Sequence, residues 1–182
     1  MLNRRTLISA SLAAVLLLGL VGLADFAHWY KSWMAEFGPG WHAMAWPFPR
    51  DGWDEGRAWR NGDTEVYIRP KLGFCSNCET GVVDDSEVDR VTDIDLLDER
   101  FQPLGGGERI HITDLPGRAR LYRIVTAKGP LTAEGIAVSL NCDLVVAIVV
   151  GKHLDSDARK EAQHFLESNT VQVWVNRQLE GR

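Results

Sequence analysis

The sequence predicts an α+β fold: an N-terminal transmembrane or signal helix, then an antiparallel meander of five or six strands covered by a C-terminal helix or helices. Three observations support it. Positions 6–24 form an uncharged run, several stretches between Thr64 and Val150 alternate apolar and polar residues, and helical spacing follows Asp155. Alternation with period two is typical of half-buried strands, whereas apolar residues at i, i+3 and i+4 indicate a helix.

The N-terminal run predicts where the rest of the chain resides. Thr6 to Ala24 contains no charge and no proline, and nineteen helical residues at about 1.5 Å each come close to the roughly 30 Å hydrocarbon core of a bilayer. Arg4 and Arg5 precede the run, which favours a cytoplasmic N-terminus. The same two arginines resemble the start of a twin-arginine export signal.

An aromatic series extends this helix beyond the membrane. Its members recur at helical spacing and end before the Gly38-Pro39-Gly40 breaker. The residues that we expect to form an interaction surface are Trp29, Tyr30, Trp33 and Phe37. The series favours an uncleaved anchor, and the alternative is a signal peptide cleaved near Ala24.

These features predict three segments and a location. Residues 1–37 form the signal-anchor or signal-peptide helix, 38–63 a connecting segment rich in Trp, Pro and Gly, and 64–182 the exported domain. We expect a single-pass protein of the inner membrane, with its N-terminus cytoplasmic and its domain periplasmic. After cleavage, the domain would instead be soluble in the periplasm.

Composition restricts the partners. The chain has 182 residues and a formal net charge of −5, which disfavours nucleic acid because such binders carry a basic face. The expected partners are the membrane and a membrane protein complex. Tryptophans are frequent before position 60, and we expect four of them to cover one edge of the core or, alternatively, to face a membrane or a partner: Trp41, Trp46, Trp53 and Trp59.

The sequence of the exported domain predicts strands followed by helices. Strands are predicted for the stretches 64–69, 91–97, 108–115, 118–126, 135–140 and 144–150, and the last is apolar on both faces and therefore expected in the middle of the sheet. Asp155 or Ser156 caps a predicted helix. Residues 170–179 fit either a strand or a helix, and we favour the helix.

Charged residues gather in one region. Eight acids lie between Asp84 and Glu99, and their spacing does not match a calcium loop. A solvated strand edge is the expected interpretation of the acidic run, and one helical turn is the alternative for residues 84–91. Arg118, Arg120 and Arg123 either capture an anion or pair with these acids from a neighbouring strand.

The three cysteines are the candidates for chemistry. A local disulfide between Cys75 and Cys78 is the expected state in an exported domain, and a bond from one of them to Cys142 is an alternative. A thiol–disulfide active site or a Cu or Zn site on Cys75, Cys78 and Cys142 are further alternatives. Glu79 follows Cys78 where haem attachment requires a histidine.

No nucleophile, phosphate or metalloprotease motif occurs in the sequence, so no catalytic residue and no cofactor are predicted. We therefore expect an exported, membrane-anchored domain that serves as an accessory or interaction protein. The alternative is a thiol–disulfide redox or Cu/Zn-handling protein that uses Cys75 and Cys78.

Overall fold

The computed structural model describes residues 22–23, 25, 40–48, 56–73, 82, 84–127, 129–140 and 142–180. The chain divides into two compact units, Met1–His42 and Ala43–Arg182. In the first unit, Gly22, Leu23 and Asp25 are helical. The rest of the predicted membrane helix, with Trp29, Tyr30, Trp33 and Phe37, lies outside the described residues. Among the residues that are described, no helix is long and apolar enough to span a bilayer.

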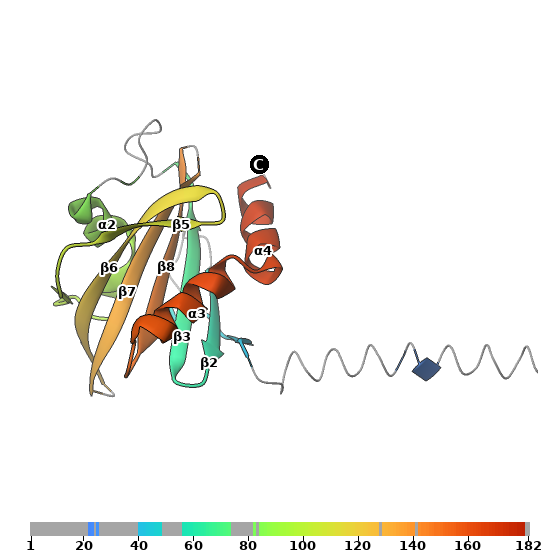
Figure 1. Cartoon of the computed structure of the whole chain (residues 1–182), viewed down its shortest axis with the longest axis horizontal. Coiled ribbons are helices and arrows are strands. Elements are labelled where there is room, and N and C mark those ends of the chain that lie inside the picture. The colour runs from blue at the N-terminus through green and yellow to red at the C-terminus, as the bar shows by residue number, and fades with distance from the viewer. Residues whose placement is uncertain are drawn as a thin grey trace, which may run out of the picture. The chain divides into compact units, whose positions relative to one another are not determined.

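An eight-stranded sheet forms the second unit's framework (Figure 1), with the path β1-β2-β3-β8-β7-β6-β4 and β5 paired to β6. Every pairing with a described register is antiparallel. The strands are β1 (His42–Met44), β2 (Arg57–Asn61), β3 (Thr64–Lys71), β4 (Gln102–Pro103), β5 (Glu108–Ile112), β6 (Leu115–Thr126), β7 (Gly129–Leu140) and β8 (Asp143–Gly151).

The sheet confirms the antiparallel α+β prediction but corrects its details. Eight strands replace the predicted five or six, and the order is no simple meander because β3 pairs with β8, which is the last strand in sequence. β1 and β4 have three and two residues, too few to produce a readable alternation. Two strands, β1 and β2, also occur in the stretch that was expected to be a loop.

β8 lies in the middle of the sheet, as its apolar sequence predicted. It pairs with β3 on one side and β7 on the other, and Val146 to Val150 are all buried. A strand covered on both faces has no solvent-facing side, so its sequence shows an apolar run in place of alternation.

Two C-terminal helices cover one face of the sheet (Figure 1). α3 (Ser156–Leu166) begins at the predicted cap, where the Asp155 carboxylate accepts hydrogen bonds from the backbone N–H groups of Asp157 and Ala158. α4 (Asn169–Glu180) confirms the helix favoured for residues 170–179. Leu166, Val171 and Val175 from these helices line one small cavity together with sheet residues such as Ile68.

The acidic stretch is helical, which corrects two predictions. α2 (Asp85–Val91) and the short 3₁₀ helix η1 (Ile94–Leu96) replace the strand predicted for 91–97 and the solvated strand edge. Val88, Val91 and Ile94 are buried, and α2 packs against β6 and β7. The apolar residues of this stretch therefore follow helical spacing and not the period of two that the strand prediction assumed. The acidic residues between them make a short amphipathic helix resemble a strand edge in sequence.

Candidate functional site

The predicted cysteine site is described only at Cys142. Cys75 and Cys78 lie outside the described residues, whereas Cys142 is exposed in the turn between β7 and β8 and is disulfide-bonded. A disulfide sulfur is not a thiolate ligand. The chain has no cysteines besides these three, so a bond to Cys142 and a local Cys75–Cys78 bridge exclude one another within one chain.

Within the described part of the chain, no group of three or more His, Cys, Asp or Glu side chains is placed to hold a metal ion.

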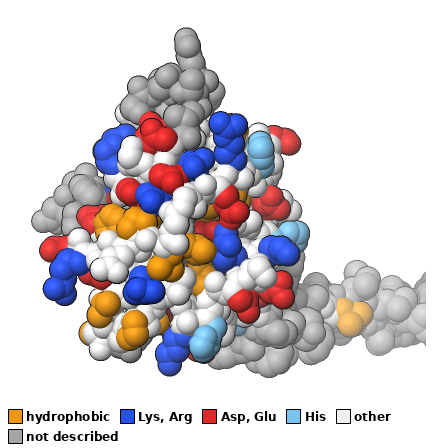
Figure 2. All heavy atoms as spheres, turned by 60° about the vertical axis from the view of Figure 1, so that its left-hand side comes forward, with side chains coloured by type: hydrophobic (Ala, Val, Ile, Leu, Met, Phe, Trp, Pro, Cys, Tyr) orange, Lys and Arg blue, Asp and Glu red, His pale blue; other side chains and the backbone are white. Residues whose placement is uncertain are grey.

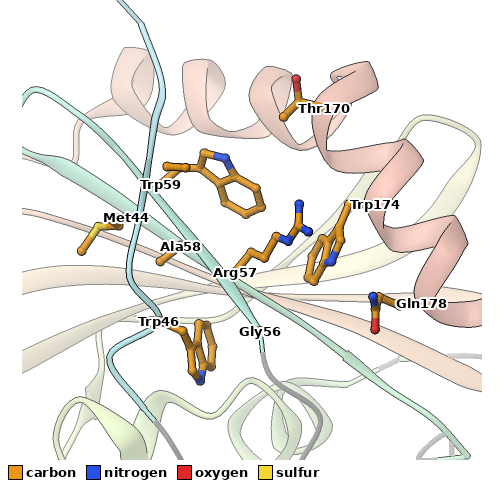
Figure 3. A pocket seen from close by; sticks show the side chains of 10 residues that line it. Met44, Trp46, Gly56, Arg57, Ala58, Trp59, Thr170, Trp174 and Gln178 are labelled. Atoms are coloured by element: carbon orange, nitrogen blue, oxygen red, sulfur yellow. The ribbon is translucent and has the colours of Figure 1, made fainter. Parts of the chain in front are cut away.

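A larger feature is an open recess of about 620 Å³ beside α4 (Figure 3). It is formed by β1, the start of β2 and the outer side of α4. Its main side chains are Met44, Trp46, Arg57, Trp59, Trp174 and Gln178.

Two buried indoles form the floor. Trp59 and Trp174 are 4% and 6% exposed, and their ring centroids lie 6.0 Å apart in an edge-to-face arrangement. Phe165 of α3 packs against Trp59 in the same manner at 5.4 Å. Strand alternation directs Trp59 toward the helices, and helical spacing puts Trp174 beside the buried Val171 and Val175. This packing holds the aromatic surface rigid.

Arg57 lies across this floor. Its guanidinium carbon is 5.2 Å from the centre of the Trp174 ring, and Figure 3 shows the side chain extending from β2 toward that indole. A cation over an aromatic face is attracted by about 0.5–1 kcal/mol at exposed sites. Among the described residues, no carboxylate forms an ion pair with Arg57. The guanidinium is thus oriented while its hydrogen-bond donors face the recess.

Trp46 closes the other end of the recess. Its ring lies edge-on to Phe48 and Tyr67, at 5.3 and 6.3 Å, and its Nε1 donates a hydrogen bond to the Phe48 carbonyl at 2.9 Å. A Cβ on Gly56 would lie 2.4 Å from the Trp46 ring and 2.5 Å from the Ile68 carbonyl oxygen. Glycine is therefore the residue that lets Trp46 approach the strand so closely.

A second recess of about 610 Å³ continues along α4 and shares Arg57, Trp174 and Gln178 with the first. It adds Val173 and Arg177. Val173 is 49% exposed, and it is one of four exposed large apolar side chains among the described residues. We call the two recesses together the α4 groove.

The α4 groove is locally basic in an acidic chain. Its described lining includes Arg57 and Arg177 but no Asp or Glu. The chain as a whole carries a formal charge of −5. The groove thus differs in charge from the protein average.

Elsewhere, several basic and acidic side chains pair with one another, and Figure 2 shows the two signs interspersed over the face that it views. Arg118 lies 2.6 Å from Asp85, and Arg120 lies 2.6 Å from Asp89. The Gly107 N–H and then Arg118 lower the pKa of Asp85. The predicted pairing of these arginines with the acidic stretch is therefore confirmed for two of them, with a helix as the source of the acids.

A buried trio links β3 to the loop after α2. Asp93 accepts a hydrogen bond from Arg69 Nε at 2.9 Å and from Lys71 Nζ at 2.5 Å, and all three residues are at most 8% exposed. Burial lowers the pKa of Lys71, and Asp93 opposes this effect. Such a trio holds two elements together and has no open face for a ligand.

Glu134 is the other buried carboxylate. It lies on β7, fully buried, and Arg159 of α3 donates to its Oε1 from Nε at 2.9 Å, while Oε2 accepts no hydrogen bond from the described residues. Burial raises the pKa of Glu134, and Arg159 opposes this shift. Arg159 also pairs with the exposed Glu108, so this cluster fixes α3 on the sheet.

The sequence predicted a partner-facing aromatic surface as an alternative for the tryptophans before position 60, but it missed Arg57, Val173 and Arg177. The available signal was the helical spacing of Thr170, Val173, Trp174 and Arg177, which places them on one side of α4. The sequence matches no protein-family model, and a search of curated proteins finds no match to it.

Proposed function

We propose that the chain is an exported, membrane-anchored binding domain that acts as an accessory to a membrane protein complex, and that it contacts its partner through the α4 groove. The uncharged N-terminal run would tether it to the inner membrane, with the domain in the periplasm. The aromatic series from Phe26 to Phe37 would continue the anchor helix.

The single observation that supports this proposal most is the composition of the groove. Tryptophan and arginine are the residues most enriched at the energetic centres of protein interfaces. Here Arg57 is oriented on the ring of Trp174, which forms the rigid aromatic floor together with Trp59. Val173 remains exposed beside Trp174. A preoriented side chain loses less entropy on binding than a mobile one.

The charged clusters support a binding role over catalysis. Asp85, Asp89 and Asp93 each form ion pairs within the fold, and Glu134 pairs with Arg159. The full or partial burial of these four carboxylates and the shifted pKa values among them are thus explained by contacts within the fold. None of the four residues lines the groove. The groove offers recognition chemistry: aromatic faces, guanidinium donors and the amide of Gln178.

The test is recovery of the full chain from native membranes in mild detergent. The wild-type chain is expected to co-purify with a defined partner, and Val173→Glu is expected to lose it because a carboxylate replaces an apolar contact. Arg123→Ala is the matched control, since Arg123 lies on β6, which is separated from β2 by three strands in the sheet order. Recovery of the wild-type chain as a lone monomer from intact membranes would contradict the proposal.

The redox or Cu/Zn alternative makes a separate prediction. It requires that Cys75→Ser together with Cys78→Ser abolish thiol exchange or metal uptake while leaving the fold intact. Loss of stability alone would assign the pair a structural role.

A further inference from the structure

We infer that the occupant of the α4 groove is an extended peptide segment of a protein partner that carries at least two acidic side chains flanking an apolar one. This inference rests on the proposed function, because it names the chemistry of the partner that the groove binds.

The charge of the groove restricts what it can bind. Arg57 and Arg177 are the only charged side chains among the described residues that line the groove, and both are cationic. Neither forms an ion pair within the described part of the chain. Arg118 and Arg120, by contrast, are paired with acids of α2. The groove therefore favours a ligand that supplies the complementary negative charge.

Guanidinium chemistry then selects the ligand's acidic group. A guanidinium presents planar donors that match a carboxylate in a two-bond arrangement. Arg57 is held by the Trp174 ring at 5.2 Å, which leaves the edge of its guanidinium for such an acceptor. A carboxylate at this point would sit above a low-polarity floor, where an ion pair is stronger than in open water.

The dimensions of the groove favour a chain segment. Asn169 and Gln178 mark its two ends along α4, nine residues apart. At 1.5 Å per residue this distance is about 14 Å, which an extended peptide covers with about four to five residues. The groove also consists of two successive recesses of similar volume, 620 and 610 Å³, joined at Arg57 and Trp174. Alternate side chains of one extended segment, which point to the same face, could enter both.

The apolar component comes from Val173. Val173 lies on α4 one turn before Arg177 and is exposed beside Trp174. An apolar side chain of the ligand would cover it and remove water from the adjacent ion pairs. The pattern expected of the ligand is therefore acidic, apolar, acidic at alternate positions of the extended segment, whose side chains share one face.

A second copy of this chain is a poorer candidate. Its own acidic stretch is folded into α2 and η1, and Asp85, Asp89 and Asp93 are engaged in ion pairs there. Releasing those acids would expose the buried Arg69 and Lys71. An acidic segment from a different chain avoids this cost.

The experiment selects peptides without assuming a partner. A random heptapeptide library is displayed on phage and selected on the full-length chain held in mild detergent. Asp and Glu should be enriched around an apolar position, and Lys and Arg depleted. A selected peptide, made synthetically, should bind Arg57→Ala and Arg177→Ala about threefold to tenfold more weakly than the wild type. Raising the salt concentration should weaken wild-type binding.

Three variants make the result specific. Arg57→Lys should recover only part of the lost affinity, because lysine keeps the charge but not the planar donors. Val173→Glu should also weaken binding by repelling the acidic peptide, and glutamate is well tolerated in helices. Arg123→Ala, the matched control at the far side of the sheet, should bind as the wild type does.

The outcomes separate this inference from the proposed function. Selected peptides that lack acidic enrichment but still fail to bind Val173→Glu would overturn the inference and leave the groove as a binding surface. Peptides whose binding no groove variant alters would overturn both. A Val173-dependent dimer that excludes the peptide, measured by analytical ultracentrifugation, would overturn the inference in favour of self-association.

Discussion

Replacing Asp93 with asparagine removes one negative charge from the most buried ion-pair cluster in the described structure. Asp93 has a backbone φ of 60°, a left-handed conformation that asparagine also adopts readily, so the substitution changes charge with little backbone strain. In the folded protein the carboxylate pairs with Arg69 and Lys71, whose side chains are 9% and 7% exposed. The amide that replaces it can accept hydrogen bonds but cannot neutralise either cation.

The expected loss of folding free energy follows from the burial of this ion-pair cluster. Removing one partner of a buried ion pair costs about 3–5 kcal/mol, because the remaining charge stays in a poorly solvated site. For a chain of this size, such a loss lowers the unfolding temperature by roughly 10 °C. Lys71 should contribute to the effect, since burial already lowers its pKa and Asp93 is the main group that opposes the shift.

The assay is thermal unfolding of the full-length chain at pH 7, followed by tryptophan fluorescence. Glu99→Gln is the control, because Glu99 is an exposed acid after η1 and its loss changes the net charge equally. A variant Asp93→Asn that unfolds within about 2 °C of the Glu99→Gln control would refute the reasoning, since the effect of a purely exposed pair is about 1 kcal/mol or less.

Three further predictions address other parts of the structure. Tyr122→Phe should cost about 1–2 kcal/mol in urea unfolding, because it deletes the 2.7 Å hydrogen bond from a fully buried hydroxyl to Asp89; an unchanged midpoint would contradict this. Burial raises the folded-state pKa of Glu134, so the folded state takes up its proton first and the wild type should gain stability as pH falls from neutrality toward 4.5. Glu134→Gln should lack that gain, and parallel pH profiles of the two proteins would count against it. Mass spectrometry of a non-reduced digest should find Cys142 in a disulfide-linked peptide, and alkylation of Cys142 without prior reduction would disprove the bond.

Local sequence patterns predicted those helices and strands whose own residues indicate how they are buried or capped. The apolar run of β8 predicted a central strand, and Asp155 predicted the start of α3. α4 was favoured because Val171, Trp174 and Val175 fall on one helical face. In each case the sequence of the element itself carries the information about burial.

The remaining features depend on partners distant in sequence. The spacing of the acidic stretch predicts a solvated strand edge, yet Asp85 and Asp89 of α2 face Arg118 and Arg120, about thirty residues later. The pairing of β3 with β8 joins strands more than seventy residues apart and has no local signature. Contacts between distant parts of the chain therefore determine these elements, and the periodicity of the local sequence does not reveal such contacts.

The candidate site was predictable only in part. The abundance of tryptophan before position 60 indicated an aromatic surface, and Trp46 and Trp59 do pack at one edge of the sheet. The α4 groove also needs Arg57 from β2 and Val173 from α4, which are separated by more than one hundred residues. Their proximity follows from the docking of α4 on the β3 side of the sheet.

Site-specific photo-crosslinking in intact membranes tests the central claim most directly. A photoreactive p-benzoylphenylalanine replaces Val173 in the groove or, in the matched control, Arg123 on β6. The account predicts that illumination joins the groove variant to one discrete partner, and that Arg57→Ala in the same chain reduces the product. A product of equal yield from the Arg123 position, or none from the Val173 position, would contradict the assignment of the α4 groove as the binding surface.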